Sequence, residues 1–387
     1  MALTQVSINN KLIVFREQII REFVRQNMFS PYMGNDMNSI IRVLNDLKSG
    51  GEQVNVPLVN SLRATAIGTG TLSGNEESID NYGFRMWIDW ARNAVKTNKA
   101  EVQKDSADIF DVARPLLTDW GKELIKNEIV DALLSIPLET APAGLGSANG
   151  QRVNGIGWNA ASAGQRNTWN ANNSDRVLYG NSVGNYNATW ATAAATVDNT
   201  NDKLTAANLR LMKRLAMSAS PRIRPYQDND GYDFWVLFCD PNQFRDLAND
   251  QTVVNANLYA RPREQRYREN PLFNDGDLMY DGVIVRQVPE MKIRKPAVFA
   301  TAGTGGTVSI NIACLCGQSA VAQFYGQLPI PTQLEVTDYG FNRGVGIEMA
   351  YGLSKVAKAT PGNAAIGSGV LKDWGVFSGF FASVDDA

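Results

Sequence analysis

Two alternating stretches around a glycine-rich segment decide the fold of this chain. Residues 53–59 read QVNVPLV, residues 64–74 read ATAIGTGTLSG, and residues 82–89 read YGFRMWID. Alternation of apolar and polar residues is typical of β-strands, and glycine among threonine and serine is typical of a turn. The pattern predicts a long β-hairpin within residues 49–98. Because an isolated hairpin is only marginally stable in water, we expect it to lie on another surface.

The rest of the chain predicts a mixture of helices and strands. The strongest helical periodicity covers residues 101–136 and ends at Pro137. Pro115 is expected either to kink this helix or to mark the first turn of its second half. Weaker patterns predict short helices at 39–47, 203–220 and 241–247, a buried strand at 232–239, and a mixture of strand and short helix at 308–326. The last strands are expected near 333–339 and 345–357. This order, without a regular βαβ repeat, indicates an α+β fold.

Residues 138–202 have an unusual composition. Asparagine, alanine, glycine and threonine dominate, and lysine is absent until Lys203. Such composition predicts a long surface excursion with little core of its own. Three tryptophans within it, Trp158, Trp169 and Trp190, indicate that the segment packs on a neighbouring surface.

Composition excludes several classes of protein. The chain has 387 residues, 44% of them hydrophobic and 20% charged, and its net charge is −2. It contains no histidine. A Ser-His-Asp or Cys-His nucleophile and a histidine-ligated metal are therefore impossible. A nearly neutral chain is also not a general nucleic-acid binder, since such proteins are usually basic.

Cysteine usage and hydropathy bear on the compartment. The three cysteines, Cys239, Cys314 and Cys316, are too few for a disulfide framework and suit a reducing cytosol. Cys314 and Cys316 are expected on one face of a strand, as small buried apolar residues rather than half of a metal site. No apolar run reaches the length of a membrane span, and residues 1–30 do not resemble a secretory signal. We expect synthesis and retention in the cytosol.

Patterns that carry chemistry are incomplete throughout the chain. Gly68, Gly70 and Gly74 lack the lysine and the spacing of a phosphate loop, which favours a flexible turn. Glu76 and Glu77 are adjacent, so on a strand they face opposite sides and cannot share one glycosidic bond. Residues 275–281 begin like a calcium loop, with Asp275, Asp277 and Asp281, but lack its later ligands. No catalytic residue, metal or cofactor is predicted.

The densest basic cluster spans residues 261–268. It contains four arginines and Glu264, Glu269 follows directly, and tyrosines stand at 259 and 267. Stacking of the tyrosines on nucleic acid is one interpretation. The interleaved acidic residues and the neutral chain favour ion pairing between subunits.

Several segments resemble one family in the same order along the chain. Residues 56–63 (VPLVNSLR), 74–77 (GNEE) and 88–95 (IDWARNAV) resemble the tailed-phage major capsid proteins of the N-four type. Four later segments resemble the same family: 236–247 (VLFCDPNQFRDL), 269–273 (ENPLF), 280–283 (YDGV) and 338–340 (DYG). Asn93 stands where members often carry histidine, and residues 140–202 depart most from the family.

The resemblance implies the Hong Kong 97 fold and a division of the chain. Its N-terminal arm would be residues 1–48, and its extended loop residues 49–98. The peripheral domain, with the spine helix and the Asn/Gly-rich insertion, would cover 99–202. The axial domain would occupy approximately 203–295, and residues 296–387 would return to the peripheral domain.

The resemblance also implies a function. Subunits would form pentamers and hexamers of an icosahedral shell around phage double-stranded DNA, contacted without sequence specificity. Portal, scaffold and decoration proteins would be further partners, with no membrane, and assembly would occur in the host bacterial cytoplasm before the protein resides in the virion. The expected inter-subunit contacts are Arg63, Gly68, Gly70, Gly74, Glu76, Glu77, Arg85, Arg92, Arg261, Arg263, Arg266 and Arg268.

Two alternatives stay open at the level of sequence. An encapsulin-type cellular nanocompartment shares the fold, although such shells are usually shorter and lack the Asn-rich insertion. A carboxylate-based glycosidase would require two acids about 5–10 Å apart in a cleft. Some relatives of this fold link their subunits covalently by isopeptide bonds between a lysine and an asparagine. This chain has no lysine between Lys48 and Lys96, so we expect no such link from its loop.

Overall fold

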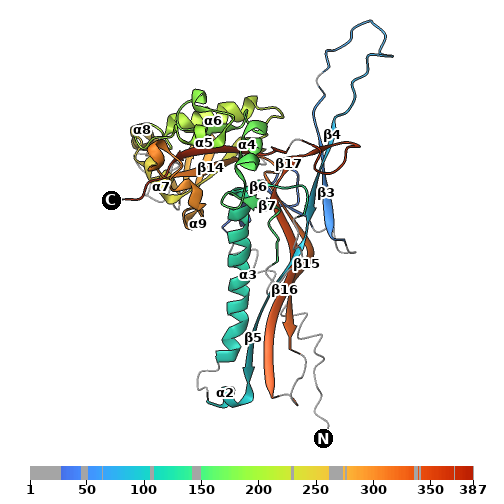
Figure 1. Ribbon diagram of the computed structural model, residues 1–387, viewed down its shortest axis with the longest axis vertical. Coiled ribbons are helices and arrows are strands. Elements are labelled where there is room, and N and C mark those ends of the chain that lie inside the picture. The colour runs from blue at the N-terminus through green and yellow to red at the C-terminus, as the bar shows by residue number, and fades with distance from the viewer. Residues whose placement is uncertain are drawn as a thin grey trace.

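The computed structural model describes most of the chain. The described residues are 28–44, 51–62, 64–104, 109–141, 150–227, 231–260, 273–274, 277–334, 339, 341–369 and 371–386. A long helix lies along a sheet of long strands, a second sheet with short helices forms a body at one end, and a thin hairpin projects beside that body (Figure 1).

The elongated part of the molecule is a five-stranded sheet with one long helix. In order, its strands are β1 (Met33–Gly34), β2 (Ile41–Leu44), β15 (Val321–Gln333), β16 (Asn342–Lys355) and β5 (Asp89–Asn98). Helix α3 (Ile109–Leu133) follows the shorter α2 (Lys99–Lys104) and packs on this sheet. Ala113 and Leu117 of the helix meet Val345 and Ile347 of β16, as apolar side chains at helical and alternating spacing should.

The body is an eight-stranded sheet drawn from distant parts of the chain. Its path is β11 (Phe273–Asn274), β12 (Asp277–Tyr280), β13 (Val283–Gln287), β10 (Asp233–Cys239), β14 (Ile310–Cys316), β20 (Val376–Ala382) and β8 (Val177–Tyr179), with β9 (Tyr226–Gln227) beside β10. The helices of the body are α4 (Ala163–Asn172), α5 (Trp190–Ala194), α6 (Ala206–Ser218), α7 (Pro241–Ala248), α8 (Gln251–Ala260) and α9 (Pro289–Ile293). The sheet is therefore not confined to the expected range 203–295, and strands from before and after that range complete it.

Three small sheets join these parts. The hairpin strands β3 (Gln53–Val59) and β4 (Asn81–Trp87) pair with each other, and β18 (Thr360–Pro361) adds to β4. β6 (Ser135–Pro137) pairs with β7 (Gly155–Gly157), and β17 (Ala357–Lys358) pairs with β19 (Lys372–Asp373). Short 3₁₀ helices occur at Ser30–Tyr32, Val183–Asn185, Ala297–Phe299 and Thr304–Gly306.

Several local expectations are confirmed. α6 and β10 lie where the helix at 203–220 and the strand at 232–239 were expected. Helix α7 begins after Asp240, whose side chain accepts the backbone N–H of Gln243 while the Gln243 side chain reaches back to the backbone of Asp240. This capping box explains why the Asp-Pro sequence starts a helix there.

Other local expectations are wrong. The helix expected at 39–47 is replaced by β2 at its described residues, and the helix expected within 308–326 is replaced by the start of β15. β2 and β15 pair in parallel from Ile41 opposite Val321. A short apolar run has too few residues to show whether its period is that of a strand or of a helix, so only the pairing decides.

The long helix is shorter than its sequence pattern. Residues 105–108 lie outside the described residues, α3 starts at Ile109 and ends at Leu133, and Ser135 already belongs to β6. Pro115 lies inside α3. Pairing of β6 with β7 takes residues 135–137 out of the helix, although their apolar pattern continues it.

The expectation that residues 138–202 have little core of their own is wrong for the described part. Trp158, Trp169 and Trp190 are at most 3% exposed and surround the same centre as Phe299 and Phe380. The ring of Trp158 lies 5.1 Å from Trp190 and 5.3 Å from Trp169, centroid to centroid. The expectation that the tryptophans pack on a neighbouring surface is confirmed within the chain itself.

Candidate assembly surfaces

The root of the hairpin is fixed on its own chain. β3 and β4 pair in register from Gln53 opposite Trp87 to Val59 opposite Asn81. On the inner face Val56, Phe84 and Met86 are buried against Phe324 of β15. This apolar face explains the alternation in the sequence and holds the root in one orientation.

Beyond its root the hairpin leaves the molecule. Every described residue from 61 to 80 is exposed, and the segment projects away from both sheets (Figure 1). Leu62, Leu72 and Ile79 are 62–67% exposed. Isolated exposed apolar side chains are ordinary, but several on one unsupported arm mark an interaction surface.

Two acidic residues of this exposed part of the hairpin accept hydrogen bonds from its backbone. The Glu77 carboxylate accepts the N–H of Ala64 across the hairpin at 2.8 Å, and Glu76 accepts the N–H of Gly74 at 2.7 Å. Gly74 has φ +88°, a conformation that favours glycine. Gly68 and Gly70 lie in the exposed arm with open space or only the Ile67 side chain near an added Cβ, so packing does not require glycine there.

The arginines expected at contacts between subunits fall into two groups. Arg85 donates to the Gln53 side chain across the hairpin root at 3.4 Å, and Arg92 lies 3.7 Å from Glu348 of β16. Both contacts are within one chain, and the Arg92 side chain is still 73% exposed. The remaining five lie outside the described residues: Arg63, Arg261, Arg263, Arg266 and Arg268.

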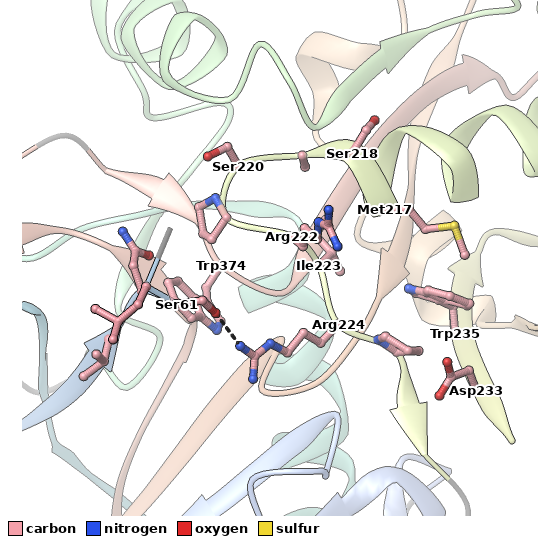
Figure 2. A pocket seen from close by; sticks show the side chains of 16 residues that line it. Ser61, Met217, Ser218, Ser220, Arg222, Ile223, Arg224, Asp233, Trp235 and Trp374 are labelled. Atoms are coloured by element: carbon pink, nitrogen blue, oxygen red, sulfur yellow. Dashed lines mark hydrogen bonds between the residues drawn. The ribbon is translucent and has the colours of Figure 1, made fainter. Parts of the chain in front are cut away.

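A cleft of about 1000 Å3 opens where the hairpin leaves its root (Figure 2). Residues 59–62 of the hairpin form one wall, and residues 217–225, the last residues of α6 and the segment after it, form the other. Trp235 and Trp374 contribute aromatic lining. Arg224 bridges the walls, because its Nη2 donates to Ser61 Oγ at 3.0 Å.

Sequence reasoning did not identify this cleft. Its second wall contains residues 220–225, which read SPRIRP and expose Arg222 and Arg224 on either side of buried Ile223. The signal in the sequence was a pair of arginines, Arg222 and Arg224, enclosed by two prolines. The position of this segment opposite the hairpin exists only in the tertiary structure.

The buried ionisable groups hold parts of the chain together. Lys355 Nζ lies 3.1 Å from Asp373 Oδ2, and both side chains are 1% exposed. Asp373 also accepts the indole N–H of Trp169 at 3.3 Å. Burial raises the pKa of the Cys314 thiol to about 12, so this cysteine is a neutral apolar residue of β14.

The described residues contain no cluster of metal ligands. Among them no three or more cysteine, aspartate or glutamate side chains gather as metal ligands. The part of the calcium-like segment at Asp275 lies outside the described residues. No helix in the described ranges is both long and apolar enough to cross a membrane.

Comparisons with known proteins identify the family of this chain. A family model described as phage capsid protein covers residues 5–377, so the chain belongs to the phage capsid protein family. It is 23% identical over 356 residues to the major capsid protein of Pseudomonas phage KPP25. The aligned region covers 90% of this chain and 89% of that relative. The protein is the major capsid protein of a phage, as its resemblance to the N-four type suggested.

Solved capsids share the fold. A chain of the cyanophage Pam1 capsid asymmetric unit is 34% identical, with a TM-score of 0.78 and 94% of both chains covered. The capsid of Ralstonia phage GP4 is 18% identical with a TM-score of 0.67, covering 100% of this chain and 96% of that one. The expected α+β fold of the Hong Kong 97 type is thereby confirmed, and the matches support a phage capsid rather than the encapsulin-type alternative.

Proposed function

We propose that copies of this chain form pentamers and hexamers, which close into an icosahedral shell around the phage double-stranded DNA. The observation that carries the proposal is the exposed hairpin arm at residues 61–80, whose root is packed but whose apolar side chains have no cover in the described chain. A hairpin that is unstable alone gains stability when it lies on an adjacent copy.

The geometry favours rings. The arm and the surface it would cover are different parts of the molecule, so the contact is head to tail, and such contacts close into rings when the rotation permits. Each copy makes one contact as donor and one as acceptor. Several modest contacts per subunit then act together, because each contact raises the effective concentration for the next.

The charge of the chain suits a container. A net charge of −2 leaves no strong general attraction to the DNA backbone, so the packaged genome can be released. We propose that the contacts with DNA are without sequence specificity. Portal, scaffold and decoration proteins are proposed partners in the virion, and assembly is proposed to take place in the host bacterial cytoplasm. We propose no catalytic activity for the protein.

Shortening the arm tests the proposal. We expect the purified wild-type protein to form closed particles under negative-stain electron microscopy. A variant with residues 66–75 replaced by a short Gly-Ser turn should stay as small oligomers or monomers. Val183→Ser, which removes a 55% exposed apolar side chain from another element, is the matched control and should assemble. Normal particles from the shortened variant would contradict the proposed role of the arm.

A further inference from the structure

The cleft at the hairpin root has the chemistry of a receptor for an acidic, partly apolar segment. Arg222 and Arg224 are exposed in its wall, and Trp374 lies in its lining (Figure 2). The lining also contains Asp233, whose carboxylate accepts the side-chain N–H of Gln227 at 3.0 Å. Guanidinium groups select carboxylates, and aromatic rings favour apolar side chains.

One segment of this chain has the complementary chemistry. Between Ala64 and Phe84 there are three acidic residues and no basic one. The outer part of this segment presents exposed Ile67 and Leu72, followed by Glu76 and Glu77. The carboxylates are already held by backbone N–H groups, so little conformational entropy is lost when they meet a partner.

The tip of the hairpin is directed away from its own cleft. Residues 59–62 line the cleft at the root, whereas the tip projects outward from the root (Figure 1). The root itself is fixed by the packing of Val56 and Phe84. A tip therefore meets a cleft only on another copy. Residues 61–70 span at most about 33 Å if fully extended, which sets the range for that neighbour.

We infer that the acidic hairpin tip of one copy, residues 67–77, docks into the root cleft of the next copy, with Glu76 and Glu77 facing Arg222 and Arg224. This inference rests on the proposed function and names the surface that receives the hairpin. Each copy then carries one tip and one cleft. Complementary charge fixes which neighbour is chosen and how it is oriented.

Cysteine pairs test the contact directly. We pair Leu72→Cys at the tip with Met217→Cys in the cleft wall, where Met217 is 46% exposed. The natural cysteines are buried and should not compete. Oxidised particles should give a ladder of disulfide-linked oligomers on a non-reducing gel. Pairing Leu72→Cys with Asp119→Cys on α3 is the control, because the Asp119 side chain is 64% exposed but lies outside the cleft, and it should leave monomers.

The cysteine experiment has clear contrary outcomes. A ladder of equal strength in the control pair would indicate unspecific crosslinking and overturn the inference. A monomer band from the first pair, through either an internal disulfide or none, would also overturn it. The monomer band is the result expected if the tip docks elsewhere on the neighbouring copy. It is also expected if a different protein occupies the cleft.

Charge exchange provides an independent readout. Glu76→Arg with Glu77→Arg, and Arg222→Glu with Arg224→Glu, should each raise the concentration needed for assembly about tenfold or more. Combining all four changes in one chain should restore assembly. Combining the glutamate changes with Arg210→Glu and Arg214→Glu on α6 should not, because these arginines do not line the cleft. Normal assembly of both charge-reversed variants would overturn the inference. If the charge-reversed variants assembled normally and the shortened hairpin variant did not, the inference would be wrong but the proposed function would still stand.

Discussion

The buried pair of Lys355 and Asp373 concentrates several contacts at one point. The ammonium lies 5.2 Å from the ring centroid of Trp169 in addition to the 3.1 Å ion pair. The backbone N–H of Asp373 donates to the Asn173 side chain at 2.8 Å, and Arg176 donates to its carbonyl. The end of β16, the insertion and β19 therefore meet at a site without water access.

Removing one charge of this pair should be costly. We expect Asp373→Ala to lower the free energy of unfolding of unassembled subunits by about 3–5 kcal/mol, because the ammonium of Lys355 remains buried without its partner. Urea denaturation measures the change. Asp119→Ala, which breaks a pair with a 64% exposed carboxylate, is the control and should cost about 0–1 kcal/mol. Equal effects of the two variants would contradict this account of the buried pair.

The carboxylate of Asp385 gives a pH-dependent contact near the end of the described chain. The Lys292 ammonium lies 2.6 Å away and Asn242 donates at 2.9 Å, which lowers the pKa of Asp385 to about 2. A lowered folded-state pKa contributes stability above the unfolded value, near pH 4, and the contribution is lost as pH falls toward 2.

The Asp385→Asn variant should reveal this dependence. Its urea midpoint should lie below that of wild type above about pH 4, and the difference should shrink as the pH approaches 2, because wild type then loses its charge. Asp198→Asn is the comparison, because the Asp198 carboxylate accepts backbone N–H groups from residues 200 and 201 at 2.6–2.7 Å and its pKa is lowered by hydrogen bonds rather than by an ion pair. Adding salt should shrink the difference for Asp385 more than for Asp198. A difference for Asp385 that is independent of pH would refute the role of its charge.

At the scale of elements, the described part of the insertion, residues 150–202, packs on one edge of the body sheet. Its strand β8 pairs in parallel with β20, and Tyr179 stacks on Phe380 at 4.8 Å between ring centroids. Trp158, Trp169 and Trp190 pack against the same Phe380 ring. The insertion therefore stabilises the sheet that it borders.

Truncating the central ring tests this role. Trp158→Ala should destabilise unassembled subunits by about 3–5 kcal/mol, because a fully buried ring leaves a cavity among four aromatic neighbours. Trp90→Ala is the control, since the Trp90 ring is 48% exposed on β5, and should cost much less. Thermal unfolding of both variants gives the comparison. A similar loss from both would show that the insertion adds little to the core.

The hairpin divides into two parts that should behave differently. The root has a paired and buried face, whereas the arm at residues 61–80 is exposed. In free subunits, amide hydrogen exchange should be slow in β4 and fast from residue 64 to 79. In assembled particles the arm should become protected. Exchange in the arm that is already slow in free subunits would mean that it packs on its own chain.

At the scale of the whole molecule, the shell should be held without covalent links from the extended loop. No lysine occurs between Lys48 and Lys96, so no amine is available there for an isopeptide bond. Boiled particles should run on a denaturing, reducing gel as one band at the monomer mass of 42.4 kDa. A ladder above the monomer would contradict this prediction, with masses lower by one ammonia per link because a lysine amine displaces the side-chain nitrogen of an asparagine.

Much of the local structure follows from the sequence alone. Alternation and glycine placed the hairpin, the 3.6-residue period placed most of α3, and the Asp-Pro sequence placed the start of α7. These signals are local, because each depends on side chains within one or two turns or on one strand pair. The absence of histidine is a property of composition, and it excludes whole classes of enzyme whatever the fold.

Tertiary contacts decided the remainder. β2 and the start of β15 are strands because they pair with each other and with β1 and β16, and neither short apolar run specifies these partners by itself. Trp158, Trp169 and Trp190 belong to the core because Phe299 and Phe380, more than a hundred residues away, complete the aromatic cluster. The root cleft exists because residues 220–225 face the hairpin across space. Pairing and burial between distant segments depend on chain topology, whereas periodicity and capping depend only on neighbours in sequence.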